Sequence, residues 1–456
     1  MNQNRAINFL KYIFAALLTA PLLSFALDKP RDMTTKHQEH NNSEGFKTAE
    51  SNATLKHAIE TIIHKSYRVK QAKERITQAK HSKDEAFGEF LPQVSVSATA
   101  TKKDSKGYEE LDYRQMQGDA TLSYNLFSSG MHVAGYQKAN LTQKEQEEKL
   151  KGVLEEEILK GIDAYYSVLY GKLAIDANKR NFEKLREVLE IVKIKKDLGA
   201  ASAGDEGSIM ASVSNAKTAL INTESMYNNA KDYYEFLTDT KTELLLPYET
   251  APEIKLKSFD EIFDEIKTAN TDLSIVKTQI KGKQKEVTLT RAMDLPKLDL
   301  VMTNSRKYRR DILDPTMMMG HNRGIAVELT LSYNLYTGGK SEAKVARLMS
   351  EVSGLAFNLE YLTKETKWNS QKLFNSVTTN TKALESLDVE IGASEKMANA
   401  YWEKFRLSSQ DLVTLLQAQR QLNAAELEKL KSEKARIVDY FNLLAKRGKL
   451  LEYFGL

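Results

Sequence analysis

The chain has 456 residues and a formal net charge of +4, with 28% charged and 41% hydrophobic residues. This composition argues against a disordered chain and against a helical membrane protein, and the charge balance provides no electrostatic basis for binding nucleic acid. The sequence contains no cysteine, which excludes disulfides, thiolate metal sites and a cysteine nucleophile.

The N-terminal segment predicts export. Two basic side chains precede an apolar run over residues 12–23, and small residues follow up to Ala26. This order is typical of a secretory signal peptide, so we expect residues 1–26 to be removed by cleavage after Ala26. The alternative is a retained anchor, but the run is shorter than the roughly 20 residues of a membrane-spanning helix. The polar residues 27–50 are expected to form a mobile leader.

Three sequence features then occur twice along the chain. They are the dipeptide Leu-Pro at 91–92 and 295–296, the sequence Leu-Ser-Tyr-Asn-Leu-aromatic at 122–127 and 331–336, and a glycine at 130 and 339. Their recurrence in the same order indicates an internal duplication. We therefore predict two related halves, residues 51–250 and residues 251–456.

Between these markers the hydrophobic pattern changes to a period of two, which is typical of strands. The predicted strands cover residues 94–101, 120–126, 298–303 and 325–335. They form one hairpin in each half, over about 92–127 and 296–336, with polar or glycine-bearing loops over 102–116 and 307–322 at the tips.

Each predicted strand has one apolar face and one face of small polar side chains. Such strands suit a transmembrane barrel, although a half-buried soluble sheet has the same pattern. Because four strands cannot close and an open edge cannot face lipid, several copies must share one barrel. The expected lipid-facing residues are Val94, Val96, Val327, Leu329 and Leu331, and the expected lumen-facing residues are Ser95, Ser97, Thr99, Glu328, Thr330 and Ser332.

Long stretches without proline predict long helices after each strand hairpin. In both halves the same number of residues separates a glycine from the next predicted helix break, from Gly130 to Gly199 and from Gly339 to Ser408. A helix of this length is ~100 Å long. Apolar residues between 345 and 362 step by three and four, the heptad pattern of a coiled coil. Long helical hairpins are therefore predicted over about 128–246 and 338–452.

The order, duplication and spacing of these features resemble the TolC family of outer-membrane efflux proteins, over about residues 51–453. The resemblance implies an α+β membrane protein, a homotrimer sharing a 12-stranded β-barrel and a long 12-helix α-barrel that crosses the periplasm. It implies a bacterial outer-membrane location in contact with outer-membrane lipid. It also implies a periplasmic adaptor (membrane fusion) protein and an inner-membrane ABC or proton-driven pump as partners, with efflux of small molecules or type I protein secretion as the function.

In the resembled family, the turns of the long helical hairpins form a periplasmic constriction. The first turn matches the family pattern at Gly199, Ser202 and Asp205, where Ser202 is expected to cap the returning helix. In the second turn the same register makes Asp411 the capping residue. The candidate gate residues are Asp205, Phe405, Gln410, Asp411, Thr414 and Gln417.

Two interpretations of these turns remain open. Asp205 and Asp411 either take part in gating or only cap helices. Phe405 stands where the family often has tyrosine, and glutamines replace charged residues found in some members, so we expect closure to depend more on packing than on charge.

Enzyme signatures are weak. The segment 338–341 imitates the end of a phosphate-binding loop, but Asn334 occupies the position of its first glycine. We expect no catalytic residues, no cofactor and no metal site. The alternative function is that of a periplasmic coiled-coil structural or adaptor protein, with the alternating segments packed as a soluble sheet.

Overall fold

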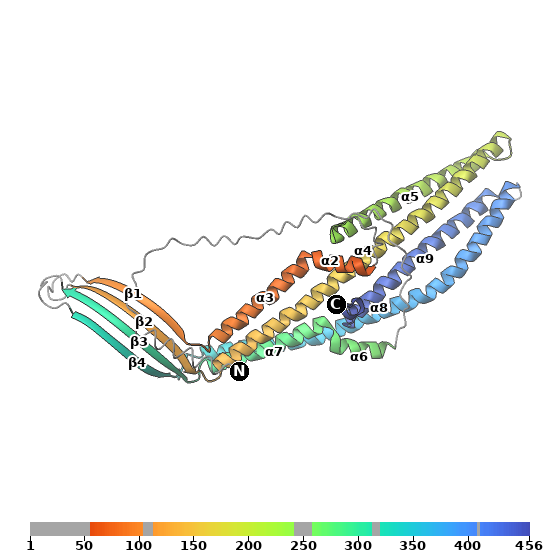
Figure 1. Ribbon diagram of the computed structural model, residues 1–456. Helices are drawn as coiled ribbons and strands as arrows, with labels where there is room; N and C mark the ends of the chain where they lie inside the picture. Colours follow the sequence, from red (N-terminus) through yellow and green to blue (C-terminus); the bar gives the residue numbers. More distant parts are fainter. Residues whose placement is uncertain (1–54, 104–112, 241–257, 312–319, 408–410) are drawn as a thin grey trace. The chain divides into compact units, whose positions relative to one another are not determined.

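The computed structural model describes residues 55–103, 113–240, 258–311, 320–407 and 411–456. The predicted signal peptide and leader, residues 1–50, lie outside these ranges. Within them, each half of the chain has the same order of elements, namely two shorter helices, two strands, a long helix and a returning helix (Figure 1).

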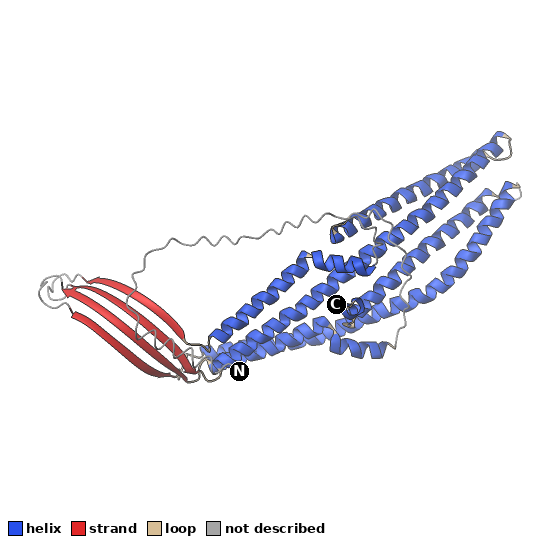
Figure 2. Cartoon of the chain, in the orientation of Figure 1, coloured by secondary structure: helices blue, strands red, loops and turns tan. Residues whose placement is uncertain are grey.

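The strands of the described chain, drawn in red in Figure 2, form one antiparallel sheet in the order β1-β2-β3-β4, as labelled in Figure 1. They are β1 (Gln93–Lys103), β2 (Tyr113–Phe127), β3 (Lys297–Asp311) and β4 (Gly320–Ser332). β1 pairs with β2 and β3 pairs with β4, so each half contributes one hairpin. β2 pairs with β3 and joins the two hairpins, which leaves β1 and β4 as the edges of the described sheet.

The strands extend further toward the hairpin tips than the sequence predicts. Parts of the expected loops 102–116 and 307–322 belong to the ladder, which continues to Lys103 on β1 and to Asp311 on β3. Polar side chains do not interrupt the ladder, because backbone groups make its hydrogen bonds. The remaining tip residues, 104–112 and 312–319, lie outside the described ranges.

At the other end of the sheet, β4 stops at Ser332, before the predicted end at residue 335. Ser332 pairs with Lys297, and the residue before Lys297 is Pro296. Proline has no N–H group to donate, so this ladder cannot continue past the pair. The predicted strand hairpin over 296–336 is therefore too long at its C-terminal end.

The long helices α4 (Met131–Asp197) and α8 (Lys340–Arg406) have 67 residues each. Each begins after a glycine with a positive φ, 83° at Gly130 and 75° at Gly339. Residues with a Cβ rarely adopt this conformation. Because neither segment contains proline, the helical hydrogen bonds run without a break, and each helix is ~100 Å long.

Returning helices pack along the long ones, α5 on α4 and α9 on α8. They are α5 (Ala203–Thr238) and α9 (Leu412–Lys446), and the short α10 (Leu450–Phe454) follows α9. The returning helices α5 and α9 both end earlier than the predicted ends of the helical hairpins at residues 246 and 452. Asp239 ends α5 with φ 53°, and Gly448 follows α9 with φ 67°. A left-handed residue ends a helix because the following backbone turns back onto the last carbonyls.

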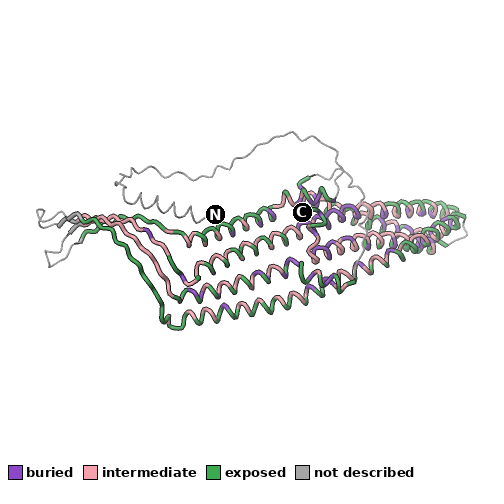
Figure 3. The backbone as a smooth tube through the Cα atoms, turned by 60° about the horizontal axis from the view of Figure 1, so that its bottom comes forward, coloured by how far each residue is buried: buried purple, intermediate pink, exposed green. Residues whose placement is uncertain are grey.

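Shorter helices precede each strand hairpin, and a buried core links the two halves. The shorter helices are α2 (Leu55–Lys65), α3 (Tyr67–Gly88), α6 (Phe259–Ala269) and α7 (Thr271–Ala292). The main core joins side chains of α2, α4 and α5 to those of α9 and α10, including Ile59, Tyr165 and Phe441. Figure 3 shows that buried positions are concentrated in the helices, whereas the strands are mostly exposed or intermediate. Each large side chain buried in this core contributes ~1.5–3 kcal/mol, which holds the halves together.

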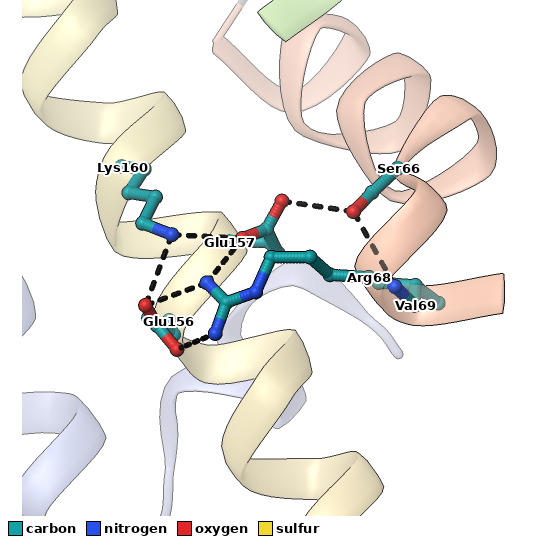
Figure 4. Close-up of polar contacts among 6 residues, drawn as sticks. All are labelled: Ser66, Arg68, Val69, Glu156, Glu157 and Lys160. Carbon is teal, nitrogen blue, oxygen red and sulfur yellow. Dashed lines mark hydrogen bonds and ion pairs between the residues drawn. The ribbon is translucent and has the colours of Figure 1, made fainter. Parts of the chain in front are cut away.

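A polar cluster fixes the junction between α2 and α3 against α4 (Figure 4). The hydroxyl of Ser66, the N-cap of α3, donates to Glu157 at 2.8 Å. Arg68 donates to both carboxylate oxygens of Glu156, at 2.6 and 2.7 Å, and to Glu157 at 3.0 Å. Lys160 contacts both carboxylates. The hydrogen bond from Arg68 lowers the pKa of Glu156 to about 2, and the buried Glu157 has the partners that a buried charge requires.

Candidate functional site

The turn ends of the two helical hairpins, around residues 199 and 408, pack together through a second buried cluster. Its members come from all four hairpin helices. They are Leu185, Val188, Val192, Ile209, Ala216, Trp402, Phe405, Leu412, Leu415 and Leu416. Because both hairpins contribute to this turn cluster, separating them here exposes apolar surface to water.

Phe405 lies in the turn cluster near the C-terminal end of α8 and is only 4% exposed. Lys195 of α4 places its Nζ 4.1 Å from the centre of the Phe405 ring and donates to the Phe405 carbonyl oxygen at 2.5 Å. The lysine thus satisfies one of the free carbonyls at a helix C-terminus and puts a cation over an aromatic face. Burial lowers the pKa of Lys195. One side chain of the first hairpin therefore binds the backbone and ring of the second.

A second lysine of α4 makes a related contact one turn earlier on α8. The Nζ of Lys184 lies 3.6 Å from the centre of the Trp402 ring, and Trp402 is also buried in the turn cluster. Lys184 and Lys195 were not among the residues expected from the sequence. The sequence shows two aromatic residues one helical turn apart, Trp402 and Phe405. The lysines that contact them are more than two hundred residues away in the sequence, so no local pattern indicates the contact.

Asp205 has its hydrogen bonds within its own helical turn. The Asp205 N–H donates to Ser202 Oγ at 3.0 Å, and the Ser202 N–H donates to Asp205 Oδ2 at 2.8 Å. The two residues form a capping box at the start of α5. These bonds lower the pKa of Asp205, the backbone N–H of Ser202 being the largest cause. The geometry gives Asp205 a capping role, and no hydrogen bond or ion pair joins its side chain to the described residues of the second hairpin.

The second turn differs from the expectation for Asp411. This residue occupies the N-cap position of α9, with φ −73° and ψ 143°, but its side chain makes no capping hydrogen bond. The third position of the helix holds Thr414, which has no carboxylate to accept the N-cap N–H as Asp205 does in the first turn. The predicted side-chain cap at Asp411 is therefore absent from the structure, and α9 lacks both hydrogen bonds of the capping box that begins α5.

The other gate candidates are not brought together with Phe405. Gln417 is exposed and Thr414 is partly exposed, and neither side chain hydrogen-bonds to a described residue. Gln410 lies outside the described ranges. Of the candidate gate residues that the structure describes, only Phe405 is buried between the hairpins.

Strand pairing sorts the sheet into two faces, because directly paired residues share a face. Val94 pairs with Leu122, Leu122 with Met302, and Met302 with Val327. The expected lipid-facing residues Val94, Val96, Val327, Leu329 and Leu331 all fall on this apolar face. Val96 is 80% exposed and Leu331 is 69% exposed, whereas Leu122 on the central strand β2 is only 4% exposed. The apolar side chains of the edge strands β1 and β4 are therefore the open part of this face.

The opposite face is polar and carries its own side-chain hydrogen bonds. Asn125 donates to Asp299 at 2.7 Å, and a 3.4 Å hydrogen bond joins the hydroxyls of Thr121 and Thr303. The residues Ser95, Ser97, Thr99, Glu328, Thr330 and Ser332, expected to face a lumen, lie on this face. Both β2 and β3 were expected as strands, but none of their side chains was assigned to a face, because their alternation is weaker than that of the edge strands.

Across the described ranges, no helix combines the length and apolarity needed to cross a membrane. Among the same residues, no group of three or more histidine, cysteine, aspartate or glutamate side chains is placed to hold a metal ion.

The fold thus combines two 67-residue helices, whose hairpin turns pack on buried aromatics, with one sheet that has an apolar and a polar face. The sequence model of the outer membrane efflux protein family matches residues 58–232. Together with the fold likeness given below, this match confirms the resemblance to the TolC family of outer-membrane channel proteins.

Individual relatives are distant in sequence and close in fold. Protein CyaE of Bordetella pertussis (strain Tohama I) is 22% identical over 303 residues, which span 65% of this chain and 63% of that protein. The crystal structure of CusC, described in connection with transmembrane channel formation, gives a TM-score of 0.77 at 11% identity over 87% of this chain and 92% of CusC. The outer membrane protein VceC from Vibrio cholerae gives 0.74 at 14% identity over 87% and 96%.

Proposed function

We propose that three copies of this chain form an outer-membrane channel that continues across the periplasm as an exit duct. The observation that carries the proposal is the apolar face of the sheet, whose edge-strand side chains are exposed. A hydrogen-bonded polar face lies behind it, and the sheet is joined to two 67-residue helices. An exposed apolar face of this extent suits lipid, and a polar face suits a water-filled lumen.

The number of strands supports oligomerisation. β1 and β4 leave unpaired backbone groups at the edges of the described sheet, which hydrocarbon cannot satisfy. Three copies of a four-stranded sheet supply twelve strands, and a sheet of that size can close into a barrel. The two halves, 51–250 and 251–456, would each supply one strand hairpin and one helical hairpin to the assembly.

The duct is proposed to export small molecules or secreted proteins. Its helical end reaches the periplasm, where a membrane fusion adaptor links it to an inner-membrane ABC or proton-driven pump. Selection of cargo belongs to the pump in this arrangement, because a water-filled duct of this kind discriminates weakly. Outer-membrane location and removal of residues 1–26 are part of the same proposal.

The resting entrance of the duct is proposed to be held closed by packing. The support is the burial of Phe405 in the turn cluster and its contact with Lys195. Asp205 is proposed to act as a helix cap, since its carboxylate is occupied by Ser202.

The proposal is tested by fractionating cells that express the full chain and by reconstituting the purified protein. We expect it in the outer-membrane fraction, cross-linked as three subunits in detergent, and conducting ions in planar bilayers. A periplasmic coiled-coil structural or adaptor protein, the alternative function, would instead leave with the soluble periplasmic fraction and give no conductance. A stable monomer in detergent would contradict both the barrel and the duct.

A further inference from the structure

The apolar face of the sheet carries a pair of arginines toward the hairpin tips. Counted from the end next to the long helices, strand pairing gives successive rows on this face. They are Tyr124, Leu300 and Leu329; then Val94, Leu122, Met302 and Val327; then Val96, Ala120, Asn304 and Ile325; then Ala98, Gly118, Arg306 and Arg323. The charge therefore appears after three rows that are mostly apolar, and the next row on this face holds Ala100, Met116 and Tyr308.

Arg306 and Arg323 are direct partners on neighbouring strands. Side chains in such a pair have Cβ atoms ~4.5–5.5 Å apart, and like charges in this position repel. Arg323 is exposed and Arg306 is partly exposed, and no hydrogen bond or ion pair joins either guanidinium to another described residue. An anion between the two guanidinium groups would remove the repulsion and satisfy both sets of donors.

The position of the arginine pair along the strands indicates which kind of anion it binds. From Leu331 to Arg323, β4 advances eight residues, or ~27 Å at ~3.4 Å per residue, which is ~20 Å along the membrane normal for a strand tilted by ~40°. The apolar band of an outer-membrane barrel is ~25 Å tall. Measured from Leu331, the arginines lie ~5 Å below the top of such a band, from where a long side chain extends to the headgroups. Tyr308 follows on the same face, where such barrels carry an aromatic girdle.

We propose that Arg306 and Arg323 together bind the phosphate group of an anionic lipid headgroup at the outer rim of the lipid-facing surface. Guanidinium groups bind phosphate through paired N–H donors, and the site faces the side from which a lipid approaches. This inference rests on the proposed function, because it requires the apolar face to meet lipid.

The test measures lipid binding to the purified full-chain oligomer by native mass spectrometry, with phosphatidic acid as the anionic probe and phosphatidylcholine as the neutral one. Wild-type protein should retain phosphatidic acid with an affinity at least about tenfold higher than phosphatidylcholine. The double variant R306Q/R323Q should lose this preference. R306K/R323K, which keeps the charge but not the paired donors, should retain part of it and shows whether the Gln variant fails only through misfolding.

The matched control is Lys307→Gln, which removes a positive charge from the same strand at the same height but on the opposite face of the sheet. It should leave the preference for phosphatidic acid unchanged. Millimolar inorganic phosphate should not displace the lipid, because the apolar rows below the arginines hold only a molecule with acyl chains.

Three results would overturn the inference, namely an undiminished preference in R306Q/R323Q, equal losses in R306Q/R323Q and K307Q, or complete displacement by inorganic phosphate. Conductance of the wild-type protein in pure phosphatidylcholine bilayers reports separately on the proposed function. A conducting channel without the lipid preference refutes only the arginine site, whereas a protein that forms no channel refutes the proposed function.

Discussion

At the residue scale, Phe405 is the clearest point of contact between the two helical hairpins. We expect Phe405→Ala to open the resting entrance, because truncating a buried aromatic removes ~3–5 kcal/mol of packing, whereas Asp205→Asn leaves the turn cluster intact. Single-channel conductance in planar bilayers should therefore rise more for Phe405→Ala. The resting conductance should change with salt concentration only as the bulk conductivity changes, because salt does not screen apolar packing as it screens surface ion pairs.

Leu407→Ala is the matched control for the gate, since this neighbouring side chain is 79% exposed. Its conductance should equal that of the wild type. If Asp205→Asn opens the channel while Phe405→Ala leaves it closed, the packed gate is wrong and an acidic latch operates at the first turn.

Glu155 makes the stability of the helical region depend on pH. Burial raises its pKa from 4.5 to about 7, although Thr271 donates a hydrogen bond to its carboxylate at 3.1 Å. Because the folded pKa lies above the unfolded value, the folded state binds more protons, so this contribution is present below about pH 4.5 and is lost as pH rises through about 7. Glu155→Gln should therefore raise the melting temperature more at pH 8 than at pH 5.

A neighbouring carboxylate provides the control for this pH effect. Arg68 lowers the pKa of Glu156 to about 2, so Glu156 is ionised throughout the range from pH 5 to pH 8. Glu156→Gln should lower the melting temperature by the same amount at both pH values. An equal shift for Glu155→Gln at both pH values would show that Glu155 does not titrate in this range.

At the element scale, the two returning helices begin with unequal caps. Ser202 and Asp205 bond reciprocally at the start of α5, whereas Asp411 makes no side-chain cap on α9. Ser202→Ala should cost ~1 kcal/mol at the start of α5, which corresponds to about fivefold faster amide exchange in its first turn. Asp411→Ala should change exchange at the start of α9 by less than about twofold, which corresponds to less than about 0.5 kcal/mol.

Hydrogen exchange read by mass spectrometry on peptides from the two helix starts compares these variants directly. The unchanged helix in each variant serves as the internal reference. If Asp411→Ala accelerates exchange in α9 as much as Ser202→Ala does in α5, then Asp411 caps its helix in solution and the difference between the turns is not intrinsic.

At the scale of the whole molecule, the two faces of the sheet should respond differently to the same substitution. Leu329→Arg places a charge on the apolar face and should cost ~2–4 kcal/mol if the site lies near the bilayer midplane. Thr330→Arg places it on the polar face and should mainly change conductance and ion selectivity. Refolding into lipid vesicles gives the free energies, and planar bilayers give the conductance. Equal destabilisation by both variants would argue against a water-filled lumen.

Much of this architecture follows from local properties of the chain. Proline-free segments that follow Gly130 and Gly339 predict long uninterrupted helices, because helix hydrogen bonds connect residues only four apart. Alternation along 94–101 and 325–335 predicts strands with two unlike faces, because successive side chains point to opposite sides. The capping pattern at Ser202 is also local, since its partners lie within one turn.

The features that the sequence analysis missed depend on residues far apart in the chain. The end of β4 at Ser332 is decided by its partner next to Pro296, and the pairing of Arg306 with Arg323 is decided by the register of the hairpin. Lys195 reaches Phe405 only because two hairpins pack at their turns. Sequence patterns determine which face or turn a residue occupies, whereas packing and register, which join distant segments, determine what that residue touches.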